Sequence, residues 1–80
     1  MKIRVLFFGM ARDIANMNSV ELEVDEDSNV SSIRAVLEKN YPKFSNSNEF
    51  SIAVNEEYAE NATVLKNNDV IAVIPPVSGG

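Results

Sequence analysis

Hydrophobic and polar residues alternate along several short segments of this chain, and each alternation predicts a β-strand. In the first segment, Ile3, Val5 and Phe7 fall on one face, with Lys2 and Arg4 on the other. A period of two residues is typical of strands, because successive side chains point to opposite faces of a sheet. The strands expected on these grounds are residues 2–8, 19–24, 50–54, 57–58 and 70–74.

A different spacing, that of an α-helix, governs residues 30–41. The hydrophobic stripe consists of Val30, Ile33, Val36, Leu37 and Tyr41. These positions share one helical face, Asn29 is a favourable N-cap, and Pro42 is expected to end the helix. A shorter helix is expected over 11–15, closed by Asn16 in the left-handed conformation, and residues 43–48 are predicted to form a polar loop.

The order of these elements predicts an α+β domain. Two strands, a helix and further strands indicate one mixed sheet of four to five strands, with the main helix across one face. This is the pattern of a β-grasp, or ubiquitin-like, roll, in which the first and last strands lie side by side in the sheet centre. We therefore expect a β-grasp domain over 1–74, followed by an extended, flexible tail over 75–80.

The alternation also predicts apolar side chains on the sheet face away from the helix. If Ile71 and Val73 face the helix, their strand neighbours must face outward, and so must those of Val5 and Phe7. The outward-facing residues are Leu6, Phe8, Ala72 and Ile74, with Tyr58 a possible addition and with Arg12 and Lys66 as flanking cations. An exposed apolar patch indicates a binding site; alternatively, loops of the chain itself cover Phe8 and Ile74.

Composition excludes several classes of chemistry. The 80 residues include no Cys, His or Trp, which rules out a disulfide scaffold, a zinc–thiolate site and a catalytic thiol or His triad. The net charge of −5 with scattered cations argues against nucleic acid. No segment suggests a secretion signal or a membrane span, so a cytoplasmic protein is expected.

Acidic residues concentrate between Glu21 and Asp27. Asp25, Asp27 and Asn29 resemble the start of a calcium-binding loop, but later positions of that motif hold valines, so no metal site is expected. The stretch is interpreted as a solvated edge, with docking to a basic partner as the alternative.

The chain ends in Pro75, Pro76, Val77, Ser78, Gly79 and Gly80. The two prolines favour an extended backbone, and glycine, which has no Cβ, can enter passages closed to other residues. The Gly80 carboxylate is therefore predicted to be the working group, presented to a narrow active site. An ordinary frayed terminus is the alternative.

Four segments together resemble the family of molybdopterin synthase small subunits, which are ubiquitin-like sulfur carriers. They are residues 65–80, residues 5–12, residues 53–55 and Tyr41-Pro42, and the Pro-Pro-Val-Ser-Gly-Gly tail is the most specific of them. The resemblance spans the whole chain. Asn16 and Asn68 stand where the family usually has Gly, and both positions are expected to need a positive φ, which Asn tolerates.

The resemblance implies that Gly80 is adenylated by a ubiquitin-activating-like enzyme, which uses ATP and Mg²⁺, and then receives sulfur from a persulfide-bearing protein. The resulting thiocarboxylate would enter the large synthase subunit, in a heterotetramer, and donate sulfur to cyclic pyranopterin monophosphate, forming the dithiolene of molybdopterin. The chain would bind no cofactor and would not be catalytic alone.

The resemblance also implies residue roles. Gly80 would carry the sulfur and Gly79 would permit threading, with Pro75, Pro76, Val77 and Ser78 in contact with the partner. Phe8, Tyr58 and Ile74 would form the docking patch, with Arg12 and Lys66 at its rim. The alternatives are a related carrier for thiamine thiazole or tRNA thiolation, a ubiquitin-like protein modifier, or a binding module with an inert tail.

Overall fold

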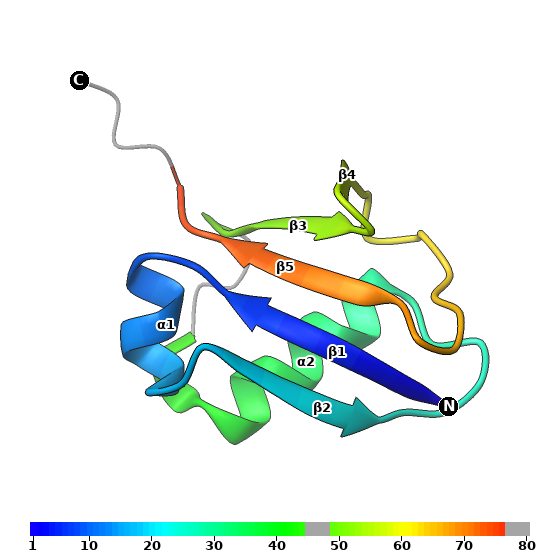
Figure 1. The fold of residues 1–80 in the computed structure, drawn as a ribbon, viewed down its shortest axis with the longest axis horizontal. Coiled ribbons are helices and arrows are strands. Elements are labelled where there is room, and N and C mark those ends of the chain that lie inside the picture. Colours follow the sequence, from blue (N-terminus) through cyan, green and yellow to red (C-terminus); the bar gives the residue numbers. More distant parts are fainter. Residues whose placement is uncertain (45–48, 77–80) are drawn as a thin grey trace.

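The computed structural model describes residues 1–44 and 49–76, which form five strands and three helical segments. Figure 1 shows their arrangement. The elements are β1 (Lys2–Phe7), α1 (Met10–Ala15), β2 (Ser19–Glu23), α2 (Val30–Asn40), the 3₁₀ helix η1 (Pro42–Phe44), β3 (Ser51–Val54), β4 (Glu57–Tyr58) and β5 (Val70–Ile74). The expected strands are all present. β1, β2 and α2 each end one residue earlier than predicted, α1 begins one residue earlier, and β3 begins one residue later.

The strands form one mixed sheet in the order β2-β1-β5-β3-β4. The central pair, β1 and β5, is parallel, and Phe7 lies opposite Val73 in its register. The outer pairings, β1 with β2, β3 with β5 and β3 with β4, are antiparallel. This arrangement confirms the predicted β-grasp, with the first and last strands adjacent at the sheet centre.

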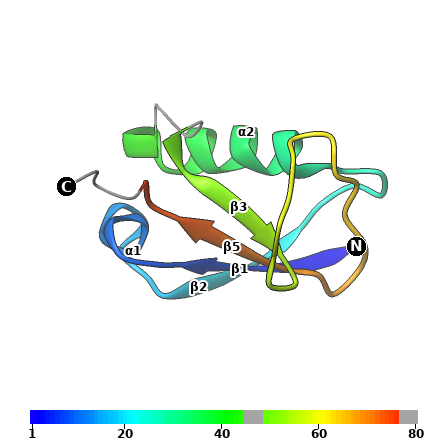
Figure 2. The ribbon, with the colours of Figure 1, turned by 90° about the horizontal axis from the view of Figure 1, so that it is seen from above.

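α2 packs across one face of the sheet, and the main hydrophobic core lies between them (Figure 2). The strands supply Ile3, Val5, Phe7, Ile52, Ile71 and Val73, and α2 supplies Val30, Ile33 and Leu37. Each of these side chains is at most 3% exposed. The sheet face turned away from α2 is called the open face below.

The first two residues of the polar loop predicted for 43–48 are helical instead, and residues 45–48 lie outside the described residues. Pro42–Phe44 forms η1, and Phe44 is buried. Its ring packs edge-on against Phe50 with centroids 5.2 Å apart, and it stacks on Phe7 at 6.2 Å. A single aromatic residue between polar neighbours has no period that marks it as core, so only the fold shows that it closes this end of the core.

Both helix boundaries expected from asparagines are present. Asn29 caps α2: its Oδ1 accepts a hydrogen bond from the Ser32 backbone N–H at 2.9 Å, and Ser32 Oγ accepts from the Asn29 N–H. Asn16 ends α1 with φ 58°, and Asn68 has φ 71°, so both adopt the expected left-handed conformation.

Within the described residues, no helix has the length and apolar character needed to cross a bilayer.

Replacing Asn29 with Ala should lower the free energy of unfolding by about 1 kcal/mol, because the Ser32 N–H loses its capping acceptor. Denaturant unfolding followed by circular dichroism measures the change. Ser31→Ala is the matched control, since Ser31 is exposed on the same helical turn, and it should change stability by less than ~0.5 kcal/mol. Equal losses in both variants would show that the cap does not stabilise α2.

Candidate functional site

One row of small and apolar side chains crosses the open face. The strand register places Leu6 opposite Ala72, Ala72 opposite Ala53, and Ala53 opposite Tyr58. Leu6 and Ala72 are half-buried, Ala53 is buried and Tyr58 is 76% exposed. The register therefore aligns apolar side chains on β1, β5, β3 and β4, and Leu6, Ala72 and Tyr58 contribute the exposed area of this row.

Phe8 and Ile74 extend this surface to the end of the sheet where β5 finishes. Phe8 follows β1 directly, is 49% exposed, and donates its backbone N–H to the Val73 carbonyl at 3.2 Å. Ile74 is the last residue of β5 and is half-buried. The open-face patch is defined as Leu6, Phe8, Tyr58, Ala72 and Ile74. The structure thus places the four predicted side chains on the open face, and Tyr58, the possible addition, lies there too.

The chain leaves the patch through Pro75, which packs against the turn between β1 and α1. Gly9 in that turn has φ 52° and ψ −127°, a conformation that favours glycine. A Cβ on Gly9 would lie 3.1 Å from Pro75 Cγ. Pro75 is half-buried and Pro76 is exposed. Val77, Ser78, Gly79 and Gly80, which were expected to form the rest of the tail, lie outside the described residues.

The two predicted rim cations lie on different sides of the patch. Arg12, an exposed residue of α1, shares a hollow with Leu6 and Phe8. Lys66, also exposed, lies beside Tyr58 and Asp69 in a separate hollow next to β4. Both cations line hollows that also include patch residues, and their proposed role at the rim of a docking surface stays a prediction.

A polar network next to the patch was not predicted. Asp69, which is 8% exposed, accepts hydrogen bonds from Asn55 Nδ2 at 2.9 Å and from the Lys66 backbone N–H at 2.7 Å. Asn55 Oδ1 in turn accepts from the Val70 N–H at 3.0 Å, and the Asn55 N–H donates to the Val70 carbonyl at 2.8 Å. These bonds fix the turn between β3 and β4 against the start of β5.

That turn holds a glutamate in a strained backbone conformation. Asn55 and Glu56 connect the paired residues Val54 and Glu57 and have φ values of 51° and 73°. Two consecutive positive φ angles are typical of a two-residue hairpin turn, whose second position favours glycine. A side chain such as that of Glu56 costs about 1 kcal/mol there. The only sequence sign of this turn was the polar pair between two strands.

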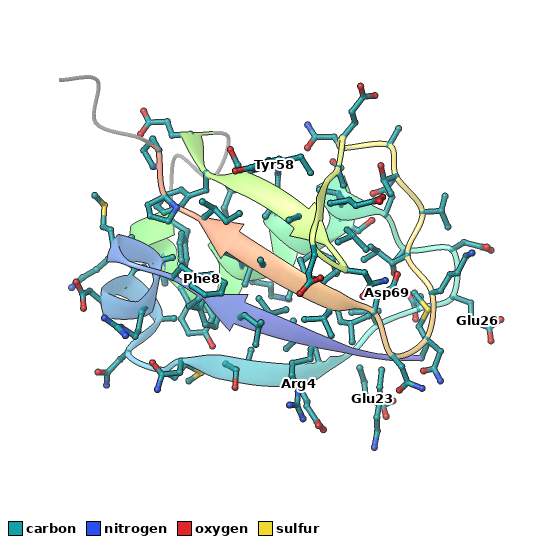
Figure 3. All side chains as sticks on the ribbon, turned by 45° about the horizontal axis from the view of Figure 1, so that its top comes forward. Arg4, Phe8, Glu23, Glu26, Tyr58 and Asp69 are labelled. Carbon is teal, nitrogen blue, oxygen red and sulfur yellow. The ribbon has the colours of Figure 1, made fainter. Side chains whose placement is uncertain are left out.

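Several charged residues lie away from the open-face patch. Glu23 and Glu26, from the acidic stretch, lie at the end of the molecule opposite Phe8 (Figure 3).

On α2, burial lowers the pKa of Arg34, while the charge of Glu38 acts to raise it. Arg34 Nε donates to Asn61 Oδ1 at 2.8 Å and so ties α2 to the loop before β5. Among the described residues, no group of three or more acidic side chains is arranged to hold a metal ion.

Known proteins of one family resemble this chain in both sequence and fold. The model of the ThiS family matches residues 5–80. A molybdopterin synthase sulfur carrier subunit from Dictyostelium discoideum is 37% identical over 84 residues, covering 99% of this chain and 96% of the relative. A putative molybdopterin converting factor subunit 1 from Pyrococcus furiosus superposes with a TM-score of 0.88 at 29% identity, covering 96% and 99% of the two chains.

A further similar structure contains a partner. In the complex of subunits 1 and 2 of the molybdopterin-converting factor from Helicobacter pylori, the matching chain is 30% identical with a TM-score of 0.72, and the match covers all of both chains.

Replacing Glu56 with Gly should raise the free energy of unfolding by about 0.5–1 kcal/mol, because glycine adopts a positive φ without strain. Glu57→Gly is the matched control. Glu57 lies in β4, where glycine weakens a strand, so this variant should lose stability. Chemical denaturation of both variants measures the two changes. A loss of stability in Glu56→Gly would show that the turn is not strained at this position.

Proposed function

The chain belongs to the ThiS family, and we propose that it is the sulfur carrier subunit of molybdopterin synthase, acting in the cytoplasm. The observation that carries the proposal is the junction of the open-face patch with the end of β5, where a docking surface adjoins the start of a Pro-Pro-Val-Ser-Gly-Gly tail. The similarity to the sulfur carrier subunits described above supports it.

The proposed chemistry takes place at the carboxylate of Gly80. A carboxylate is a poor electrophile, so an activating enzyme first couples it to AMP, using ATP and Mg²⁺ and releasing pyrophosphate. The terminal sulfur of a protein persulfide then displaces AMP and forms an acyl disulfide with Gly80. A thiol of the donor or activating protein reductively cleaves the S–S bond of this acyl disulfide, which releases the thiocarboxylate and leaves a disulfide on that protein. The chain has no Cys, so its own side chains offer no thiol, and the sulfur must be supplied from outside.

The loaded tail then donates its sulfur to cyclic pyranopterin monophosphate inside the large synthase subunit. Residues 75–80 span at most ~20 Å when fully extended, which limits how deep the acceptor can lie. Prolines reduce the conformational entropy lost on entry, and Gly79 leaves room for the narrow passage. Two such transfers form the dithiolene. The chain itself binds no cofactor and provides no catalytic side chain.

Docking positions the tail for this transfer. We assign the contact with the large subunit to Phe8, Tyr58 and Ile74. These apolar side chains lie near the end of β5, where the tail begins, and burying them against a partner would exclude water from the interface. Arg12 and Lys66 provide polar contacts at the rim. A heterotetramer of two carriers and two large subunits is the expected assembly.

Two alternatives share the same reactive end. A carrier for thiamine thiazole or tRNA thiolation would be loaded in the same way but would donate its sulfur to a different acceptor. A protein modifier would transfer its acyl group to lysines instead. The molybdopterin assignment is preferred because the D. discoideum and P. furiosus proteins carry that name.

Incubation with the matching activating enzyme, ATP, Mg²⁺ and a persulfide donor should increase the intact mass of the chain by the difference between a sulfur and an oxygen atom. Tandem mass spectrometry should locate the added mass at Gly80. An unchanged mass would contradict the carrier function, and conjugates with other proteins would favour a modifier.

The control for this experiment is a chain that lacks Gly80. It should unfold at the same temperature as the complete chain, because the last strand among the described residues ends at Ile74, yet it should not deliver sulfur. A large loss of thermal stability would show that the terminal residue also maintains the fold.

Replacing Phe8 with Asp should weaken binding to the large subunit by at least about tenfold, since truncating a docking anchor and burying a charge each cost a kcal/mol or more. Isothermal titration calorimetry measures the affinity. Ala35→Asp adds the same charge at an exposed position of α2 and should leave affinity unchanged. If Phe8→Asp unfolds the isolated chain, Phe8 belongs to the core and our assignment of the patch is wrong.

A further inference from the structure

A hollow in the open face combines an apolar floor with one acidic wall. It has a volume of about 380 Å³ and is lined by Leu6, Phe8, Asn55, Glu56, Val70 and Ala72. Leu6 and Ala72 are direct neighbours across the central strand pair and form part of the floor. The turn between β3 and β4 supplies the polar wall. The hollow therefore has the shape and chemistry to receive a side chain that is apolar along its length and polar at its tip.

The acidic wall is held in a fixed position. Asn55, immediately before Glu56, is anchored to Asp69 through its side-chain amide and to Val70 through both its side chain and its backbone. The positive φ of Glu56 places the residue where glycine would be less strained. Strain that persists in a well-anchored turn is often found at binding sites, where it orients a group in advance.

The charge of Glu56 has no partner within the part of the chain that the structure describes. Glu56 is exposed, and none of the described side chains forms an ion pair or hydrogen bond with its carboxylate. Arg4 lies on the same sheet face, in the row that β1 shares with Val70, but its guanidinium is bound to Glu21 at 3.0 Å. The carboxylate is thus available to a cation from outside.

We propose that this hollow binds an arginine or lysine side chain of the large synthase subunit, with Glu56 as the residue that selects it. The aliphatic stem covers Leu6, Phe8 and Ala72, as long cationic side chains commonly do on apolar surfaces. The cationic head forms a charge-assisted hydrogen bond with the Glu56 carboxylate. A second copy of this chain, which has a net charge of −5, is a poorer electrostatic match. The inference rests on the proposed docking function.

The test compares binding of the large subunit to the complete chain and to Glu56→Gln, which keeps the shape of the side chain and removes its charge. Glu56→Gln should weaken the affinity about tenfold and flatten its dependence on salt concentration. Glu56→Lys should weaken it further through repulsion. Glu57→Gln is the matched control: Glu57 lies opposite Val54 in the register, on the face that carries the core, and its loss should change affinity less than twofold.

Two results would overturn the inference in distinguishable ways. If the complete chain binds and Phe8→Asp abolishes binding, but Glu56→Gln binds within twofold of the complete chain with the same salt dependence, the docking function stands and no cation occupies the hollow. If the complete chain does not bind the large subunit at all, the proposed function itself is wrong and the inference fails with it.

Discussion

The parallel pairing of β1 with β5 is the constraint on which the rest of this structure depends. It places the first strand beside the last one at the centre of the sheet, and their core-facing side chains Val5, Ile71 and Val73 are at most 1% exposed. Because β5 has a neighbour on each side, its end is fixed relative to the sheet. Phe8 and Ile74 consequently lie at the same end of the sheet, next to the start of the tail.

One face of the sheet forms the core, and the open face is available for docking. A chain of this size has a small core, and α2 covers one face to form most of it. The open face retains half-buried and exposed apolar side chains that the core does not use. A rigid body with one free apolar face can dock without a large rearrangement, and the proposed chemistry requires only that docking and tail entry occur together.

Much of this arrangement follows from local patterns, because alternation and helical spacing are visible in the sequence. The strands, α2, the cap at Asn29 and the left-handed Asn16 could all be predicted in this way, whereas the positive φ of Asn68 was expected from the family resemblance. Burial of Phe44 could not, because it depends on the distant rings of Phe7 and Phe50. The strain at Glu56 could not be predicted either, because it depends on the strand register. The pairing of Val54 with Glu57 leaves Asn55 and Glu56 as the two turn residues with positive φ. The Pro-Pro and Gly-Gly residues of the tail were enough to predict the Gly80 carboxylate as the working group, but its sulfur chemistry came from resemblance to a family.

The most direct test of the account follows the sulfur atom itself. The chain is loaded with radiolabelled sulfur, purified, and mixed in a single turnover with the large subunit and cyclic pyranopterin monophosphate. The account predicts that the label moves from the chain to the pterin and that the carboxylate of Gly80 is regenerated. Label that remains on the chain while the two subunits form a stable complex would contradict the claim that its terminal carboxyl group donates sulfur.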